Sequence, residues 1–220
     1  GLFLHIFLIL KENDKMVKLR SAVNFQLKAG WFGSEQKAPP IILKEIPLVS
    51  FTQISGWPDN FEKKIQKLLS VLGFSELGTF SKAQIAKEKT VFRVGPERIL
   101  VWSSGAFEWN TIKSLADKNS LSFLDLSHAR TIIQLEGVKV PDLLARLISV
   151  DLNNESFPGQ CFVLTAIHSV PVMLYRRLDG LKGPSFNLFI PYTWSASLVE
   201  LICQTALPFG YVVKGPLPQD

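Results

Sequence analysis

A short pattern of residues occurs twice in this chain, and this repetition constrains the fold more than any single motif does. Residues 53–56 (QISG) recur as 134–137 (QLEG), and residues 68–71 (LLSV) recur as 147–150 (LISV). In both copies a β-branched or apolar run ends in glycine, and a proline-led apolar run follows it. Self-similarity of this kind is typical of a repeated supersecondary unit. The sequence therefore predicts a tandem duplication.

The first copy is predicted from its apolar spacing. Residues 41–54 are rich in β-branched and apolar residues, which indicates one or two strands. Pro58 is expected to open a helix that Gly73 ends. The apolar residues of that helix fall on one stripe: Phe61, Ile65, Leu68, Leu69 and Leu72. Strands at 78–86, 90–94 and 98–102 and a helix at 106–116 complete the copy.

The second copy has much the same order. Strands are predicted at 122–126 and 131–135, a helix at 141–150, and a loop at 151–160. Three strands at 161–167, 170–176 and 186–190, a helix at 193–206 and a strand at 209–213 follow. Each copy alone would leave a sheet face uncovered, so the copies are expected to share one core. The predicted fold class is α+β, with a duplicated strand–helix–three-strand–helix unit.

These patterns divide the chain into four parts. Residues 1–40 form an N-terminal arm, 41–120 the first α+β repeat, 121–213 the second repeat, and 214–220 a C-terminal tail. Residues 1–15 are interpreted as non-native or upstream of the natural start, because Met16 begins a more ordinary sequence. Residues 1–10 are apolar but too short to cross a bilayer, and no membrane association is predicted.

The charge and the composition bear on which partners the chain can have. The formal net charge is +5, and the excess lies in residues 1–90, which hold 13 Lys and Arg against 8 Asp and Glu. Its densest cluster, Lys63, Lys64 and Lys67, fits a solvated helix face, so nucleic acid is not an expected partner. With 47% hydrophobic residues and 16 Phe, the chain needs either a large core or a partner that covers part of its surface.

The chain offers little catalytic machinery. Cys161 and Cys203 are far apart, which fits a reducing, cytoplasmic setting and argues against a disulfide framework. Neither cysteine lies at metal-ligand spacing from a histidine, so no metal is predicted. Asp125, Ser127 and His128 have the composition of a triad. However, His128 is expected to point away from the other two on an extended strand, and no G-x-S-x-G elbow is present.

Asp125 and Arg130 form the remaining ionic pair of interest. They lie on adjoining predicted strands across a tight corner, where a carboxylate and a guanidinium can pair. Two interpretations stay open: a structural bridge at the corner, or a contact with a ligand or a partner chain. No catalytic, cofactor-binding or metal-binding residue is predicted.

Several segments resemble the gamma subunits of heterotetrameric sarcosine oxidases. They are residues 27–33, 42–56, 95–102, 124–137, 143–161 and 186–202. The resemblance runs from about residue 21 to residue 213, and it is carried most by the D-L-S-x-x-R run at 125–130 and the F-P-G-x-C loop at 157–161. It implies the fold of the folate-binding region of glycine-cleavage T proteins and other aminomethyltransferases, a duplicated α+β unit.

The resemblance also implies a function. Such a complex oxidatively demethylates sarcosine to glycine, uses oxygen, forms peroxide and passes the one-carbon unit to tetrahydrofolate. The flavins, NAD, tetrahydrofolate and zinc are then expected in larger partner subunits, and this chain is expected to bind none of them. Two alternatives are a free-standing folate-binding aminomethyltransferase-like protein and, with no positive support in the sequence, a regulatory module.

Overall fold

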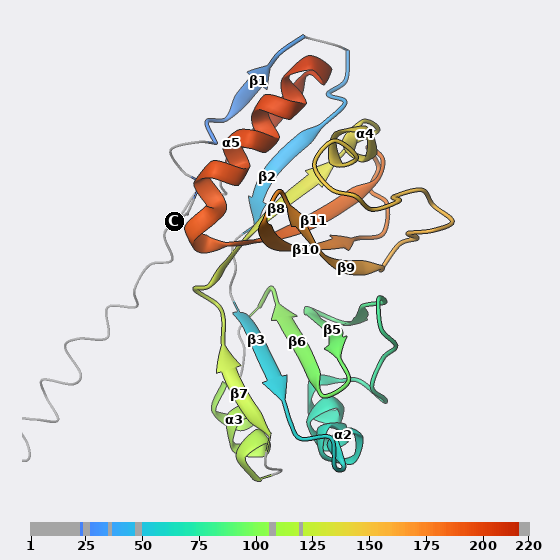
Figure 1. Cartoon of the computed structure of the whole chain (residues 1–220), viewed down its shortest axis with the longest axis vertical. Helices are drawn as coiled ribbons and strands as arrows, with labels where there is room; N and C mark the ends of the chain where they lie inside the picture. Colours follow the sequence, from blue (N-terminus) through green and yellow to red (C-terminus); the bar gives the residue numbers. More distant parts are fainter. Residues whose placement is uncertain are drawn as a thin grey trace, which may run out of the picture.

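The strands form two β-sheets (Figure 1) in the computed structural model, which describes residues 23, 27–34, 37–46, 50–105, 109–118 and 121–215. The strands are β1 (Gly30–Phe32), β2 (Ile42–Ile46), β3 (Ser50–Ser55), β4 (Gln84–Ala86), β5 (Lys89–Gly95), β6 (Arg98–Ser103), β7 (Ser122–Asp125), β8 (Arg130–Glu136), β9 (Phe162–Ile167), β10 (Val170–Arg176), β11 (Ser185–Pro191) and β12 (Tyr211–Lys214). The helices are α2 (Phe61–Leu72), α3 (Trp109–Lys118), α4 (Val140–Leu144) and α5 (Ser195–Ala206), with 3₁₀ turns η1 (Tyr192–Trp194) and η2 (Leu207–Phe209).

The two sheets stack face to face with helices on their outer faces. The order is β1-β12-β2-β8-β11-β10-β9 in the seven-stranded sheet and β4-β5-β6-β3-β7 in the five-stranded sheet. One core cluster joins the seven-stranded sheet to α4 and α5, a second joins the five-stranded sheet to α2 and α3, and a third lies between the sheets. Alternation along single strands produces this layering. On β8, Ile132 faces the other sheet while Ile133 faces the helices.

Helix α2 confirms the predicted apolar stripe. All five stripe residues are buried, and Gly73 ends the helix in a left-handed conformation with φ of 94°. This conformation lets the Gly73 N–H reach the carbonyl of Ser70 at 3.1 Å. The start differs from the prediction. The helix begins at Phe61 after a left-handed Asn60, so Pro58 lies in the preceding turn rather than at the first helical position.

Helix α4 is shorter than predicted. It covers Val140–Leu144 rather than 141–150. The Leu147 N–H bonds to the carbonyl of Leu144, three residues back, and the segment continues as turns. The apolar residues that suggested a longer helix still pack against the core, because Ile148 is buried there. Hydrogen bonds three residues back occur here beside bonds four residues back, such as that from the Ile148 N–H to the Leu144 carbonyl at 2.9 Å.

Both sheets contain the same chain path. The elements β3-α2-β4-β5-β6-α3-β7 are followed by β8-α4-β9-β10-β11-α5-β12. Strand order in the second set matches that in the first, except that β2 lies between β8 and β12. A glycine follows the first strand of each set, at a position where a side chain would be crowded. A Cβ at Gly56 would lie 2.8 Å from the Phe61 ring, and one at Gly137 would overlap the Pro40 carbonyl oxygen.

Two strands pair within the sheet of the other predicted repeat. β2, assigned to the first repeat, pairs with β8 and β12 of the seven-stranded sheet. β7, assigned to the second repeat, pairs with β3 of the five-stranded sheet. The division at residues 40, 120 and 213 otherwise stays a prediction. The sequence did not predict β1, which pairs with β12, and the interpretation of residues 1–15 lies outside the described residues.

Aromatic rings fill the space between the sheets. Phe92 of β5 meets Phe162, Tyr175 and Phe189 of the seven-stranded sheet edge to face, at centroid distances of 5.1, 5.2 and 5.8 Å. Phe51 of β3 stacks on Phe189 at 5.3 Å. Such pairs add to the free energy gained by burial alone. No helix of the described residues is long and apolar enough to cross a membrane.

We predict that Phe92→Ala lowers the free energy of unfolding by about 3–5 kcal/mol, because it removes a fully buried ring and leaves a cavity between the sheets. Denaturant unfolding followed by tryptophan fluorescence measures the change. Trp57→Ala is the control, since this side chain is 78% exposed and its removal should change stability by less than about 0.5 kcal/mol. Equal effects of the two substitutions would contradict the role given to Phe92.

Candidate functional site

The corner between β7 and β8 holds the predicted site residues, and backbone hydrogen bonds organise it. The Asp125 carboxylate accepts the Ser127 N–H at 2.8 Å. The Ser127 hydroxyl oxygen accepts the Phe51 N–H at 3.0 Å, and the Leu126 N–H donates to the Phe51 carbonyl at 2.7 Å. On the other side, the Tyr192 N–H donates to the Ala129 carbonyl at 3.0 Å. The corner therefore connects β3 of one sheet to the end of β11 in the other.

These hydrogen bonds show whether Asp125, Ser127 and His128 can act as a catalytic triad. Ser127 is only 8% exposed and its oxygen is engaged with β3, while His128 is exposed. The Asp125 carboxylate bonds to backbone rather than to an imidazole. A serine nucleophile needs a base within hydrogen-bond reach. The arrangement is one of structural support, with no nucleophile–base contact.

Arg130 lies close to Asp125 in the sequence but does not pair with it. The ion pairs found within the described ranges are Glu62–Arg93, Lys139–Asp142 and Arg176–Asp179. The Arg130 guanidinium instead donates to the Pro171 carbonyl at 3.5 Å, across β11 to β10. Partial burial lowers the pKa of Arg130. A direct carboxylate–guanidinium clamp is thus not formed, and a role of either residue at an interface stays a prediction.

A second polar cluster, which the sequence did not predict, surrounds Arg176 at the end of β10. This side chain is only 2% exposed. Its guanidinium donates to the Phe157 carbonyl at 2.8 Å and to the side chains of Asn154 and Asp179. The loop at 151–160 is therefore folded around a buried cation. The only sequence signal was an arginine that ends an apolar strand beside a loop rich in turn-forming residues.

Asp151 fixes the start of the same loop. Hydrogen bonds from the Ser156 hydroxyl and the Asn153 N–H lower the pKa of Asp151. The Asn153 carboxamide oxygen in turn accepts the N–H groups of Glu155 and Ser156. These are Asx-type turns, in which a short polar side chain replaces a backbone partner. The loop is therefore held by its own side-chain hydrogen bonds.

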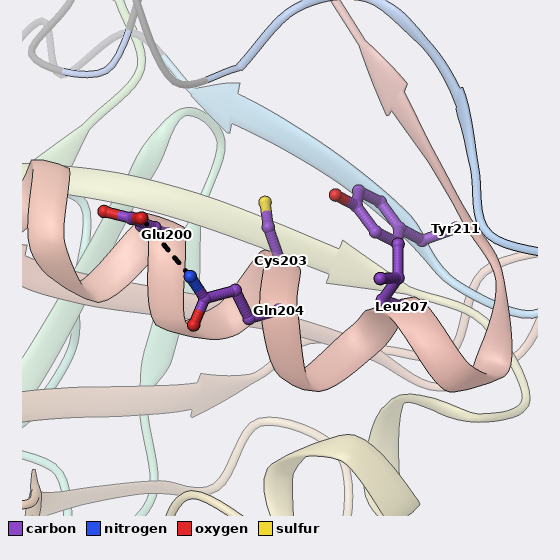
Figure 2. Close-up of a pocket in the computed structure, with 5 residues that line it drawn as sticks. All are labelled: Glu200, Cys203, Gln204, Leu207 and Tyr211. Atoms are coloured by element: carbon purple, nitrogen blue, oxygen red, sulfur yellow. Dashed lines mark hydrogen bonds between the residues drawn. The ribbon is translucent and has the colours of Figure 1, made fainter.

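A surface pocket lies at the end of α5 (Figure 2). It has a volume of about 480 Å³ and is lined by Glu200, Cys203, Gln204, Leu207 and Tyr211. The Gln204 amide donates to the Glu200 carboxylate at 3.3 Å, and the side chains of Cys203 and Tyr211 point toward each other. The Tyr211 ring also stacks on Phe32 of β1 at 5.1 Å. The pocket is formed where α5, η2 and β12 meet.

The pKa values of two groups in this pocket, Cys203 and Tyr211, are raised. Burial raises the pKa of the Cys203 thiol, with a further increase from the charge of Glu200 and an opposing effect of its hydrogen bond with Tyr211. Burial and the contact with Cys203 raise the pKa of Tyr211. A thiol that stays protonated is a poor nucleophile and a poor metal ligand. Across the described part of the chain, no three His, Cys, Asp or Glu side chains are grouped so as to hold a metal ion.

Comparison with known proteins establishes the fold. No protein-family model and no curated protein sequence matches the chain. A chain of the heterotetrameric sarcosine oxidase from Corynebacterium sp. U-96, in complex with pyrrole 2-carboxylate, matches with a TM-score of 0.68 and 18% sequence identity, over 81% of this chain and 88% of that chain. Aminomethyltransferase T of the glycine cleavage system from Bartonella henselae matches with a TM-score of 0.60 and 14% identity, over 80% of this chain.

The chain spans about half of that aminomethyltransferase, of which 48% is covered. The predicted relation in fold to both proteins is therefore confirmed. The fold is α+β with two sheets, as in the matched chains. At these sequence identities the likeness concerns the fold and not the activity.

We predict that Arg176→Met destabilises the protein by roughly 2–4 kcal/mol, because it leaves buried loop carbonyls without their charged donor. Limited proteolysis should then cut within residues 151–160 while the rest of the chain is still folded. The neighbouring Arg177 gives a matched control, since it is exposed. Arg177→Met should leave both the unfolding midpoint and the cleavage pattern as they are in the unaltered chain.

Stability is also expected to fall at alkaline pH. The pKa values of Cys203 and Tyr211 are higher in the folded than in the unfolded chain, where they are 9.0 and 10.0. The folded state therefore binds more protons above about pH 9, and the free energy of unfolding decreases as pH rises beyond that point. Tyr211→Phe should make this decrease shallower between pH 9 and pH 11. Tyr192→Phe, at an exposed tyrosine, should leave the slope unchanged.

Proposed function

We propose that this chain is a non-catalytic assembly subunit of a sarcosine oxidase complex, in the position of the gamma subunit. The observation that carries the proposal is the likeness in fold to a chain of a heterotetrameric sarcosine oxidase, over 88% of that chain. The residue patterns at 124–137 and 143–161 resemble the same kind of subunit. The whole complex would oxidatively demethylate sarcosine to glycine and pass the one-carbon unit to tetrahydrofolate.

The hydrogen bonds of the polar side chains favour a structural role over a catalytic one. Asp125 and Ser127 are engaged with the backbone of the β7–β8 corner, and Arg176 is engaged with a loop. Burial raises the pKa of the Cys203 thiol. These groups stabilise the fold and present no activated nucleophile.

The proposal assigns the cofactors to other chains. Flavins, NAD, tetrahydrofolate and zinc would be bound by larger flavin-bearing partner subunits, in the cytoplasm, and this chain would bind none of them. Aromatic packing between the two sheets supports this assignment. Phe92 and Phe189, both fully or almost fully buried, occupy the centre of the molecule.

We also propose that the fold arose by duplication of a strand–helix–three-strand–helix unit. The support is the equivalent order of elements from β3 to β7 and from β8 to β12, together with the glycines at 56 and 137, which occupy crowded positions after the first strand of each set. Insertion of β2 next to β8 would then have widened the second sheet.

The alternative function is a free-standing folate-binding protein of the aminomethyltransferase type. The observation in its favour is the fold shared with aminomethyltransferase T. A folate-binding protein of this type needs a central pocket, and the aromatic cluster fills the space between the sheets. A pterin ring has about the size of a tryptophan side chain, and close-packed cores have no voids of that size.

The proposal predicts a stable complex with larger chains. When this chain is tagged and co-expressed with the larger subunits of a sarcosine oxidase, the purified material should contain all chains, absorb as flavin and form peroxide on addition of sarcosine. The control is co-expression of the larger subunits without this chain, which should give less assembled oxidase. Full assembly and full activity in that control would overturn the proposal.

Calorimetry distinguishes an assembly subunit from a folate-binding protein. Titration of the isolated chain with tetrahydrofolate should give no heat of binding if the chain is an assembly subunit. Saturable binding in the micromolar range, about −8 kcal/mol, would instead support the folate-binding alternative.

A further inference from the structure

The outer edge of β9 differs from the other sheet edges. The remaining edge strands are short: β1 and β4 have three residues each, and β7 has four. β9 has six residues and ends the seven-stranded sheet. Short edge strands are one way in which proteins prevent edge-to-edge pairing. β9 does not have this protection.

β9 also lacks charged residues, proline and a bulge. No Lys, Arg, Asp or Glu occurs from Cys161 to Tyr175, and β9 itself contains no proline. Its register with β10 is continuous from Phe162 to Ile167, with no bulge. On its exposed side, Leu164 is 56% accessible. An uncharged edge of this length, with no bulge, favours pairing with another strand.

The register shows which backbone groups point outward. The Arg176 N–H bonds to the Cys161 carbonyl, toward β10, while the Phe162 N–H bonds to the Ser81 carbonyl, on the opposite side. Alternation along an antiparallel strand then directs the groups of Leu164 and Ala166 to the open edge. Pro171, which has no N–H, lies opposite Ala166, as expected where the groups of residue 166 face away from β10. Within the part of the chain that the structure describes, the 81–83 segment covers the start of β9, and no other strand pairs with this edge.

We propose that the β9 edge pairs with the β9 edge of a second copy of this chain, antiparallel about a two-fold axis at Thr165. This register joins the two sheets through the N–H and C=O groups of Leu164 and Ala166 of each copy. It sets Leu164 of one copy against Ala166 of the other, a large side chain against a small one. The inference goes beyond the proposed function and does not depend on it.

Two features favour a second copy over a different partner. The strand complements itself, because Thr165 meets its own counterpart, and threonine pairs across antiparallel strands are favourable. The absence of charged residues on β9 means that two copies do not repel each other there. The pairing is isologous, and it uses the β9 edge of each copy. It therefore stops at a dimer.

The first test is the mass of the full-length chain in solution, measured by sedimentation velocity over a range of concentrations. The chain should form a dimer of twice 24.6 kDa. Ala166→Pro removes an outward N–H that β10 does not use, and Leu164→Lys places a charge at the edge. Both should give a monomer with an unchanged circular dichroism spectrum. Leu181→Lys, at a fully exposed leucine of another loop, makes the same chemical change and should leave the dimer intact.

The second test checks the register by cross-linking. Residues directly opposite in an antiparallel pair have Cβ atoms about 4.5–5.5 Å apart. Thr165→Cys should therefore form an intermolecular disulfide under mild oxidation. Val163→Cys should not, because the two copies of residue 163 would lie about 13 Å apart along the strands. The unaltered chain gives the background from Cys161 and Cys203.

A dimer that Ala166→Pro and Leu164→Lys abolish, with cross-linking through residue 165 and not 163, is the expected result. A chain that is monomeric at every concentration overturns the proposal. So does a dimer that survives both edge substitutions, a series of growing oligomers, or equal cross-linking at 163 and 165. None of these measurements uses the larger oxidase chains, so their outcome is separate from that of the co-expression experiment.

Discussion

The ring of Phe92 meets three other rings edge to face between the two sheets, and these contacts set the position of nearly everything else. Neither sheet buries both of its faces with its own helices. The inner face of each is apolar and is covered by the other sheet, through Phe51 and Phe92 on one side and Phe162 and Phe189 on the other. A layered α/β/β/α arrangement follows, because each layer covers an apolar face that would otherwise contact water.

The β7–β8 corner extends this dependence into the backbone. The Phe51 ring belongs to the inter-sheet cluster, and its N–H and C=O groups both bond to the corner, at Ser127 and Leu126. The Ala129 carbonyl then binds the start of η1. The Asp, Ser and Arg side chains of this short stretch thus lie at a crossing point between the sheets, where each bonds to a backbone group.

What the sequence predicted depended on how local the signal was. The stripe of α2 and the glycine that ends it are local, and both were predicted correctly. In α4 the same reasoning overestimated the helix, since apolar spacing from Leu143 to Ile148 reflects burial and not continuous helical bonding. The pairing of β2 with β8, and of β7 with β3, is set by contacts far apart in the chain. No pattern along the sequence indicates such pairing.

In the candidate site, too, contacts between residues far apart in the sequence could not be predicted. Arg130 was singled out because it follows Asp125 closely, yet its donor group reaches Pro171, forty-one residues away. Arg176 was not singled out, although its guanidinium organises an entire loop. Sequence proximity identifies residues of one turn, whereas a buried cation is recognised only when the carbonyls of another segment are seen to converge on it.

The composition has a different meaning in the light of the fold. A hydrophobic fraction of 47% suggested that a partner must cover excess apolar surface. Within the described residues, the three core clusters take up many large apolar side chains, and exposed ones such as Trp57, Leu124 and Leu181 lie on different elements and loops. Scattered exposed side chains of this kind are normal on a protein surface. The feature that calls for a partner is instead the unprotected backbone of β9, where association would be specified by hydrogen-bond register rather than by apolar area.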